Sequence, residues 1–284
     1  MHRALDWRSI MYILSAVIEC GRSKVALFDK DYKLLSEKCG TCAEISELCS
    51  NVMADNGISC GDVEYLGVAV DASFGNPVDT AAEIEKNSGI KCYGASIISA
   101  RALGEAYISN DVPYLTLLKI DEDIECGLVI DKKVYAGVHQ EGGKIGNMII
   151  NYGGFECECG RRGCFKAYAS NSGLKRIASD AGVANADSIT HKELFAMNTP
   201  EAEKAKETYL KFLSSGITNV INLFQPNELV LEGPFTEVGE ALDAPMMETL
   251  LRDQYTHSAP NKCNIRVSVK DTDTALLGAS LLGR

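Results

Sequence analysis

The sequence predicts an α/β fold, because strand-length apolar runs alternate with segments of helical periodicity along the chain. The runs Tyr65–Val70 and Leu229–Leu231 are typical buried strands, and each lies beside a segment whose apolar residues have helical spacing. The 46% hydrophobic and 24% charged composition is ordinary for a globular protein. The 284 residues are enough for one large or two ordinary domains.

Charge and cysteine usage exclude several classes of protein. The formal charge of −11 argues against nucleic acid as a partner, and no helix-turn-helix pattern precedes the first strand. No apolar run is long enough to span a membrane. The 11 cysteines are odd in number and scattered, which indicates reduced thiols of a cytoplasmic protein and no disulfide framework.

The first apolar run, Ile10–Ile18, imitates a signal peptide because Arg3 and Arg8 precede it. We interpret it as the first core strand, since the polar stretch Glu19–Lys24 follows it without a small-residue cleavage site. Met11 is an alternative start, which would make residues 1–10 a dispensable tail.

The remaining elements follow from periodicity and from Gly and Pro punctuation. Residues 12–38 alternate like a β-hairpin around a tight glycine turn. We expect helices over residues 43–57, 80–87, 95–107, 171–181, 190–197, 201–224 and 274–282. We expect further strands over residues 65–70, 91–93, 114–120, 229–231 and 264–269.

Three cysteines lie within eight residues in the run C-E-C-G-R-R-G-C, from Cys157 to Cys164. Gly160 and Gly163 let the backbone fold back tightly, so that three sulfurs can converge on one point. This geometry suits a tetrahedral zinc ion with Cys157, Cys159 and Cys164 as thiolate ligands. The alternative is three reduced cysteines buried in a turn.

This motif, continued by F-K-A-Y-A-S, resembles the signature of the ROK family of repressors, open reading frames and sugar kinases. Further matches are A-L-G-E at 102–105, I-G-N-M at 145–148, I-N-L-F-Q-P at 221–226 and the last helix. The resemblance covers the chain from about Tyr12 to Arg284. It implies an actin-like ATPase (ribonuclease H-like) fold with two lobes around a central cleft. The small domain would be residues 1–104 completed by helix 272–284, and the larger domain residues 105–271.

On the nucleotide side, the family's D-x-G-G-T-K opening is replaced by E-C-G-R-S-K at 19–24. The resemblance gives weak nucleotide-binding roles to Glu19, Gly21, Ser23 and Lys24. Glu19 would replace the Asp that organises the metal-bound nucleotide. Arg22 places a long side chain where phosphate needs bare backbone. An ordinary hairpin turn is the alternative interpretation.

The family's second phosphate loop, G-T-G-I-G-G-G, maps to residues 121–127, where four carboxylates replace glycine and threonine. Close carboxylates would repel phosphate, so ATP with Mg²⁺ is a doubtful cofactor. The acids could instead hold Mg²⁺, or form a solvated turn. Gly127 remains, and Gly233 remains from a third glycine turn in which Glu232 and Pro234 flank it.

On the sugar side, the family's catalytic Asp falls on Ile97, which has no titratable group, so we assign no catalytic residue. The resemblance makes substrate-binding candidates of five other residues: Asn76, Glu141, Lys144, Asn147 and Lys166. The two lysines stand where the family has glutamate, and Asn147 stands where it has a zinc-binding histidine. The fourth zinc position would therefore fall to Asn147, to water or to another side chain such as His139.

Scaffold motifs are kept and chemical motifs are altered, so the leading hypothesis is a sugar-kinase-like binding or regulatory protein without phosphoryl transfer. Its small-molecule partner would be a sugar or a sugar phosphate. If Lys144 and Lys166 face the pocket, the pocket would prefer an anionic ligand, for instance a sugar phosphate or an acidic sugar. A collapsed pocket with both lysines solvated is the alternative. Other hypotheses are an active ATP-dependent hexose or N-acetylhexosamine kinase, and a structural partner of an active paralogue. The resemblance implies a homodimer.

Overall fold

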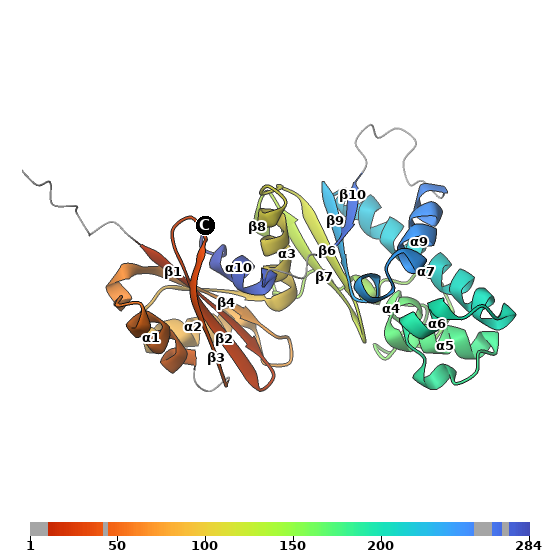
Figure 1. Cartoon of the computed structure of the whole chain (residues 1–284), viewed down its shortest axis with the longest axis horizontal. Helices are drawn as coiled ribbons and strands as arrows, with labels where there is room; N and C mark the ends of the chain where they lie inside the picture. The colour runs from red at the N-terminus through yellow and green to blue at the C-terminus, as the bar shows by residue number, and fades with distance from the viewer. Residues whose placement is uncertain (1–10, 42–44, 253–262, 269–272) are drawn as a thin grey trace, which may run out of the picture. The chain divides into compact units, whose positions relative to one another are not determined.

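Strands and helices alternate as predicted in the computed structural model of the protein, which describes residues 11–41, 45–252, 263–268 and 273–284. The described strands form two five-stranded sheets, each accompanied by helices (Figure 1). The predicted α/β class is therefore confirmed. The alternative start at Met11 concerns residues 1–10, which lie outside the described residues.

The first sheet has the order β3-β2-β1-β4-β5. Its strands are β1 (Tyr12–Glu19), β2 (Arg22–Phe28), β3 (Leu34–Gly40), β4 (Val63–Val70) and β5 (Cys92–Ser96). The predicted hairpin is present: β1 and β2 pair antiparallel, with Glu19 opposite Arg22 across the Cys20-Gly21 turn. β4 and β5 then continue the sheet in parallel, which leaves β5 at an edge.

The helices agree closely with the predicted ranges. Their bounds are α1 (Ile45–Asp55), α2 (Pro77–Ser88), α3 (Ile97–Ile108), α4 (Lys166–Ala169), α5 (Asn171–Ala181), α6 (His191–Ala196), α7 (Pro200–Phe224), α8 (Phe235–Val238), α9 (Glu240–Arg252) and α10 (Thr274–Ser280). Thr199 caps the start of α7 through its side chain, and Pro226 follows its end. Helices α4, α8 and α9 were not predicted: α4 and α8 have only four residues each, and Pro245 interrupts the helical pattern of α9.

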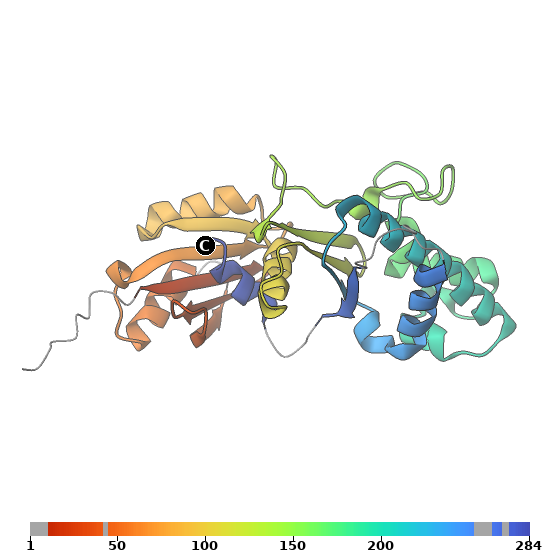
Figure 2. The ribbon, with the colours of Figure 1, turned by 90° about the horizontal axis from the view of Figure 1, so that it is seen from above.

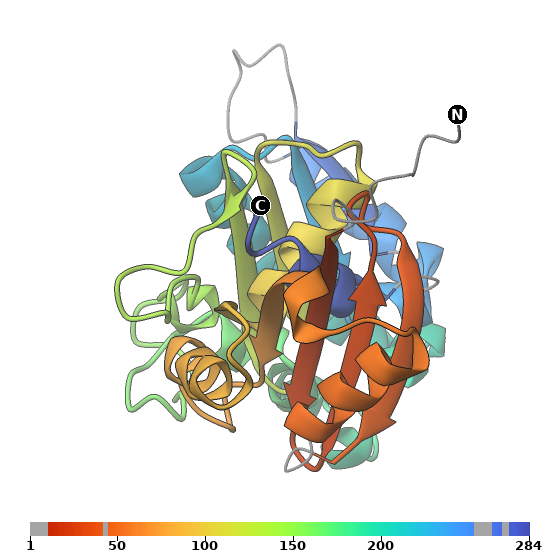
Figure 3. The same ribbon diagram turned by 90° about the vertical axis from the view of Figure 1, so that its left-hand side faces the viewer.

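Helices cover both faces of the first sheet. Apolar residues of α1 and α2, among them Val52 and Ile84, join Leu14, Val25 and Val68 in one buried cluster. Figure 3 shows α1 (orange) lying across these strands. Helix α10 packs on β1 and β4, and α3 lies beside it (Figures 1 and 2). Because both faces are covered, the central strands read as almost continuous apolar runs.

The second sheet has the order β10-β9-β6-β7-β8. Its strands are β6 (Leu115–Ile120), β7 (Ile124–Ile130), β8 (Lys133–Val134), β9 (Glu228–Glu232) and β10 (Asn264–Val267). β9 pairs in parallel with both β6 and β10, whereas β7 and β8 form an antiparallel hairpin. A turn of three residues, Asp121 to Asp123, joins β6 to β7.

Contacts divide the chain into two units. Unit 1 comprises Met1–Pro113, Gly127–Gly142 and Lys270–Arg284, and unit 2 comprises Tyr114–Cys126 and Gly143–Val269. The sequence-based domains, residues 1–104 with 272–284 and residues 105–271, stay a prediction. Within the described parts of the chain, no helix combines the length and apolarity needed to cross a bilayer.

Helices α3 and α10 of unit 1 touch through their backbones. A Cβ atom at Gly278 would lie 1.6 Å from the carbonyl oxygen of Ala100, and one at Gly104 would lie 2.2 Å from that of Thr274. Neither distance is possible for real atoms, so both positions require glycine. The A-L-G-E and A-L-L-G-A-S motifs therefore encode a helix crossing, which is a requirement of packing.

We expect Gly278→Ala and Gly104→Ala each to lower the free energy of unfolding by at least about 2 kcal/mol, because the new methyl group forces two backbones apart. Urea unfolding followed by circular dichroism measures this. Gly61→Ala is the matched control, since a Cβ there would approach no atom closer than 3.8 Å. A near-neutral Gly278→Ala would contradict the packing.

Candidate metal centre and ligand site

The cysteine motif of unit 2 forms a tight turn held by short bridges. Ile149 pairs with Cys164, and Glu156 pairs with Arg162. Gly160 and Gly163 have φ values of +82° and +83°, which favour glycine, as the sequence indicated. A Cβ at Gly163 would also lie 1.8 Å from the carbonyl oxygen of Asn151. The turn therefore depends on glycine for both conformation and space.

The three sulfur atoms converge as predicted. Those of Cys157, Cys159 and Cys164 all lie within 4.8 Å of one another, and Cys159 Sγ is 3.4 Å from Cys164 Sγ. Cys157 and Cys164 are buried and Cys159 is exposed. This arrangement can hold a metal ion. His139 does not belong to the cluster.

The environment separates the acidities of two of the thiols. The backbone amide and then the guanidinium of Arg161, together with the neighbouring thiols, lower the pKa of Cys159 to about 6. Burial, aided by the same thiol neighbours, raises the pKa of Cys164 to about 12. The cluster thus presents one readily ionised thiol at its surface.

Asn147 lies at the end of a short 3-10 helix, Ile145–Asn147, near the motif. Its carbonyl oxygen accepts a hydrogen bond of 2.9 Å from Arg161. Its side-chain Oδ1 is buried without a hydrogen-bond partner. A buried amide oxygen without a partner costs free energy unless something binds it, which suits an additional ligand or water here.

An aromatic cluster supports the cysteine motif. Tyr168 stacks on Phe155 and Phe212, with ring centroids 4.5 and 4.0 Å away. Its hydroxyl oxygen accepts hydrogen bonds from Asn151 Nδ2 at 2.8 Å and from the Phe155 amide at 2.7 Å. The ring and the hydroxyl together fix the chain that leads into the first cysteine.

Lys166, the first residue of α4, is buried in an ion-pair network. Its Nζ lies 2.7 Å from Glu158 Oε1 and 3.1 Å from Asp123 Oδ2, and its side chain is only 10% exposed. Burial acts to lower the pKa of Lys166, but the hydrogen bonds to Glu158 and Asp123 outweigh it and raise the pKa above its usual range. The Lys166–Asp123–Glu158 network joins the acidic turn to the cysteine motif.

The acidic turn between β6 and β7 is an ordered structure. Asn171, at the start of α5, donates through Nδ2 to Asp121 at 2.9 Å and to Glu122 at 3.2 Å. Its backbone amide donates to the Asp121 carbonyl oxygen. Lys119 lies 3.3 Å from Glu125. Neighbouring polar groups therefore engage all the acids of this turn.

A buried histidine lies in the same unit. His191 Nε2 is 2.7 Å from the hydroxyl of Tyr209, which donates to the carbonyl oxygen of Ala169 at 3.0 Å. Since the Tyr209 proton goes to Ala169, His191 acts as the donor and carries its proton on Nε2. Burial lowers the pKa of His191 to about 4, with the charge of Asp121 opposing it.

In unit 1, a pocket of about 400 Å³ lies beside the start of α3. Ile97, Glu19, Lys24 and Asp273 line it, together with Arg22 and Arg101. Lys24 Nζ is 2.7 Å from Asp273 Oδ2, and this hydrogen bond raises the pKa of Lys24. The structure therefore brings Ile97 together with the residues of the first phosphate-loop position.

The other residues predicted for the nucleotide side lie in turns or in packing contacts. Gly21 forms the β1–β2 turn with a φ of +76°, and Ser23 is buried. Gly127 packs β7 against α3, because a Cβ there would lie 2.3 Å from the Ile98 carbonyl oxygen. Gly233 follows β9, and a Cβ there would lie 1.9 Å from the Ile120 carbonyl oxygen.

The other predicted sugar-side residues divide between the units. Asn76 caps α2, and its Oδ1 accepts from the amides of Val78 and Asp79. Glu141 in unit 1 and Lys144 in unit 2 are exposed.

Sequence reasoning missed the partners of Lys166, namely Asp123 and Glu158, and also Arg101. The sequence carried a signal for these partners. A lysine stands at position 166, where the resemblance expects an acid, and acids stand in the loop 121–127, where it expects glycines.

Comparison with solved structures shows the fold. The ROK hexokinase from Thermus thermophilus superposes with a TM-score of 0.80 at 20% identity, covering 96% of this chain and 97% of that chain. The fold is therefore the actin-like ATPase fold of the ROK sugar kinases.

The sequence profile of the ROK family matches residues 45–284. The chain belongs to the ROK family. Curated relatives include a xylose repressor from Bacillus spizizenii, 29% identical over 54% of this chain and 38% of its own length. They also include an N-acetylgalactosamine kinase from a Shewanella species, 31% identical over 42% and 41%. The matches thus span about two-fifths of the length of these relatives.

The buried histidine makes stability depend on pH. Its folded pKa of about 4 lies below the unfolded value of 6.5, so the unfolded chain binds the proton first. Stability is complete above pH 6.5, and falls by about 3 kcal/mol in total as the pH drops through 4. We expect His191→Gln to show a shallower loss between pH 6.5 and 4 in urea unfolding.

The exposed His139→Gln is the control, and should follow the wild-type pH dependence. Equal slopes for all three proteins would show that His191 does not titrate with a lowered pKa.

Proposed function

We propose that this ROK protein is a sugar-kinase-like binding or regulatory protein that does not transfer phosphoryl groups. The observation that carries the proposal is the Lys166–Asp123–Glu158 network. The network joins Asp123, which stands in the family's second phosphate loop, to Lys166, which stands where the resemblance expects a sugar-binding carboxylate. Two positions that the resemblance assigns to phosphate and sugar binding are thus paired with each other.

Proton abstraction lacks an obvious base. Ile97 has no proton acceptor, although a general base must lie within hydrogen-bond reach of the attacking hydroxyl. An active hexose or N-acetylhexosamine kinase would have to use Glu19 or Asp273, the carboxylates that line the same pocket. The carboxylate of Asp273 is already engaged by Lys24, whose Nζ lies 2.7 Å from Asp273 Oδ2.

Phosphate binding is also disfavoured. A carboxylate about 4 Å from a phosphate charge costs roughly 4 kcal/mol at the effective dielectric of a protein surface. The turn between β6 and β7 places Asp121, Glu122 and Asp123 in succession. Lys166 offsets one of these charges, so the turn stays negative overall.

The network also bears on the ligand. One lysine faces two carboxylates, so Lys166 offers no free positive charge for a sugar phosphate. We therefore infer a neutral sugar as the ligand class, in keeping with the sugars that the relatives' names carry, xylose and N-acetylgalactosamine. Neutral sugars need paired hydrogen-bond donors and acceptors, which an ion-pair network supplies.

We also propose that Cys157, Cys159 and Cys164 bind a structural zinc ion. Thiolates are strong zinc ligands, whereas the carboxamide of Asn147 is a poor one, so a water would complete the tetrahedron. Zinc would lock the turn that carries Glu158 and would thereby support the Lys166 network.

We expect about one zinc per chain in metal analysis after dialysis, falling by at least about tenfold in Cys164→Ser and Cys159→Ser, because a thiolate ligand is lost. Cys60→Ser, at an exposed cysteine outside the cluster, is the matched control and should keep its zinc. Wild-type protein that stays metal-free after refolding with zinc would refute the assignment.

Calorimetry with Mg²⁺ and ATP tests the main proposal. We expect no binding at micromolar concentrations and no sugar-dependent ADP release in a coupled assay with a panel of hexoses and xylose. Ile97→Asp should also stay inactive, because it restores a carboxylate without relieving the acidic turn.

Turnover by wild-type protein, abolished by removing Mg²⁺, would establish the kinase alternative. Turnover gained by Ile97→Asp alone would show that the acidic turn tolerates ATP, and would refute that part of the argument.

A further inference from the structure

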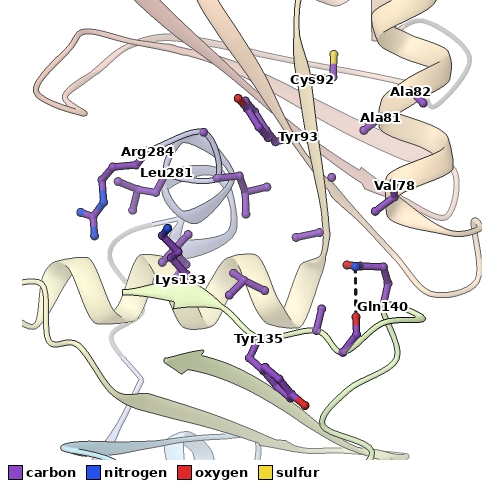
Figure 4. A pocket seen from close by; sticks show the side chains of 18 of the residues that line it. Val78, Ala81, Ala82, Cys92, Tyr93, Lys133, Tyr135, Gln140, Leu281 and Arg284 are labelled. Carbon is purple, nitrogen blue, oxygen red and sulfur yellow. Dashed lines mark hydrogen bonds between the residues drawn. The ribbon is translucent and has the colours of Figure 1, made fainter. Parts of the chain in front are cut away.

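Unit 1 contains a second, larger cavity that the proposed sugar site does not use. Its volume is about 920 Å³, and it lies among α2, β5, β8 and the chain end after α10 (Figure 4). It shares no lining residue with the pocket at Ile97. This volume lies within the range of small-molecule sites.

The walls of the cavity are mainly apolar. Val78 and Ala81 come from α2, Val134 from β8, and Leu281 and Leu282 from the chain end. Figure 4 shows Val78 and Ala81 on one side and Leu281 on the other, with Gln140 as a polar side chain at the edge. Such apolar surface suits a hydrocarbon or a ring.

Two tyrosines contribute aromatic surface. Tyr93 on β5 and Tyr135 after β8 line the cavity from opposite strands (Figure 4). The ring of Tyr93 is held by Tyr65, whose centroid is 5.5 Å away, edge to face. Lys91 Nζ lies 5.0 Å from the same ring. A fixed aromatic wall favours an aromatic ligand.

Three cationic side chains line the cavity, although the chain carries a net charge of −11. Lys132 and Arg284 both bind Asp111, at 2.8 and 2.6 Å. Lys133 is exposed and has no ionic partner among the residues that the structure describes. One lining carboxylate, that of Glu85, is already engaged by a backbone amide.

The edge of β5 adds a further preference for carboxylates. The Leu66 amide donates to the Lys91 carbonyl oxygen at 2.9 Å, so the alternate residues Cys92 and Gly94 direct their amides to the open edge. The Cys92 amide indeed binds the carboxylate of Glu85, at 2.8 Å. Gly94, the next amide along this edge, lines the cavity.

We propose that this cavity binds a small aromatic carboxylate, with its ring on the apolar wall between α2 and the chain end, and its carboxylate paired with Lys133. The site requires nothing from the residues of the proposed sugar site. The chain would therefore respond to a second ligand of a different chemical class.

Displacement of the fluorescent aromatic anion 8-anilinonaphthalene-1-sulfonate from the full chain tests the class of ligand. We expect 2-naphthoate to displace it, and 2-naphthalenemethanol, which lacks the charge, to compete at least about fivefold less well. Glucose 6-phosphate should not compete. Equal competition by the neutral alcohol, or strong competition by the sugar phosphate, would overturn the assignment.

Two variants place the binding in this cavity. Lys133→Glu reverses the free charge of the rim, and Val78→Trp fills the cavity from the half-exposed face of α2. Each should weaken 2-naphthoate binding roughly tenfold in calorimetry, with an unchanged melting temperature. Lys211→Glu, an exposed lysine on α7, is the control for net charge and should bind as wild type.

Unchanged binding in both variants, or an equal loss in Lys211→Glu, would overturn the proposal, as would the absence of any binding by the wild type. These outcomes do not depend on ATP or sugar, so they are separate from a failure of the proposed sugar-binding function.

Discussion

The close approach of α3 to its neighbours is the constraint on which unit 1 depends. Three glycines permit it: Gly104 within α3, Gly278 on α10, and Gly127 on β7. Each sits where a Cβ would lie within 2.3 Å of a backbone carbonyl oxygen, so each helix and strand meets another backbone directly. These contacts exclude any side chain larger than that of glycine. They place no requirement on which side chains stand at the start of α3.

The packing of α3 and the side chain at its first residue are therefore separate matters. Ile97 occupies the first turn of α3, about two turns before Gly104, so an apolar side chain there does not disturb the crossing. Ser96 still caps the helix through its side chain. The helix thus keeps its start, its length and its partners, while the position that the resemblance assigns to a base carries no proton acceptor.

Much of the fold was predictable because its signals are local. The α7 helix has Thr199 and Pro200 at its start and Pro226 after its end, and the structure has it within one residue of the predicted range. The convergence of three sulfurs was also predictable, because Gly160 and Gly163 stand between cysteines that are close in sequence. Helix α9 was missed, because Pro245 within it breaks the pattern that sequence reasoning depends on.

The candidate site was less predictable, because its partners are distant in sequence. The sequence suggested that Lys166 is solvated or faces a ligand. In the structure it pairs with Asp123, which is 43 residues away in the sequence. Removing one partner of a buried lysine leaves an unpaired charge, so Lys166 depends on both Asp123 and Glu158. Reversing Lys166 alone would leave three carboxylates in contact. The Lys166–Asp123 ion pair therefore cannot be altered at one position without leaving an unpaired charge at the other.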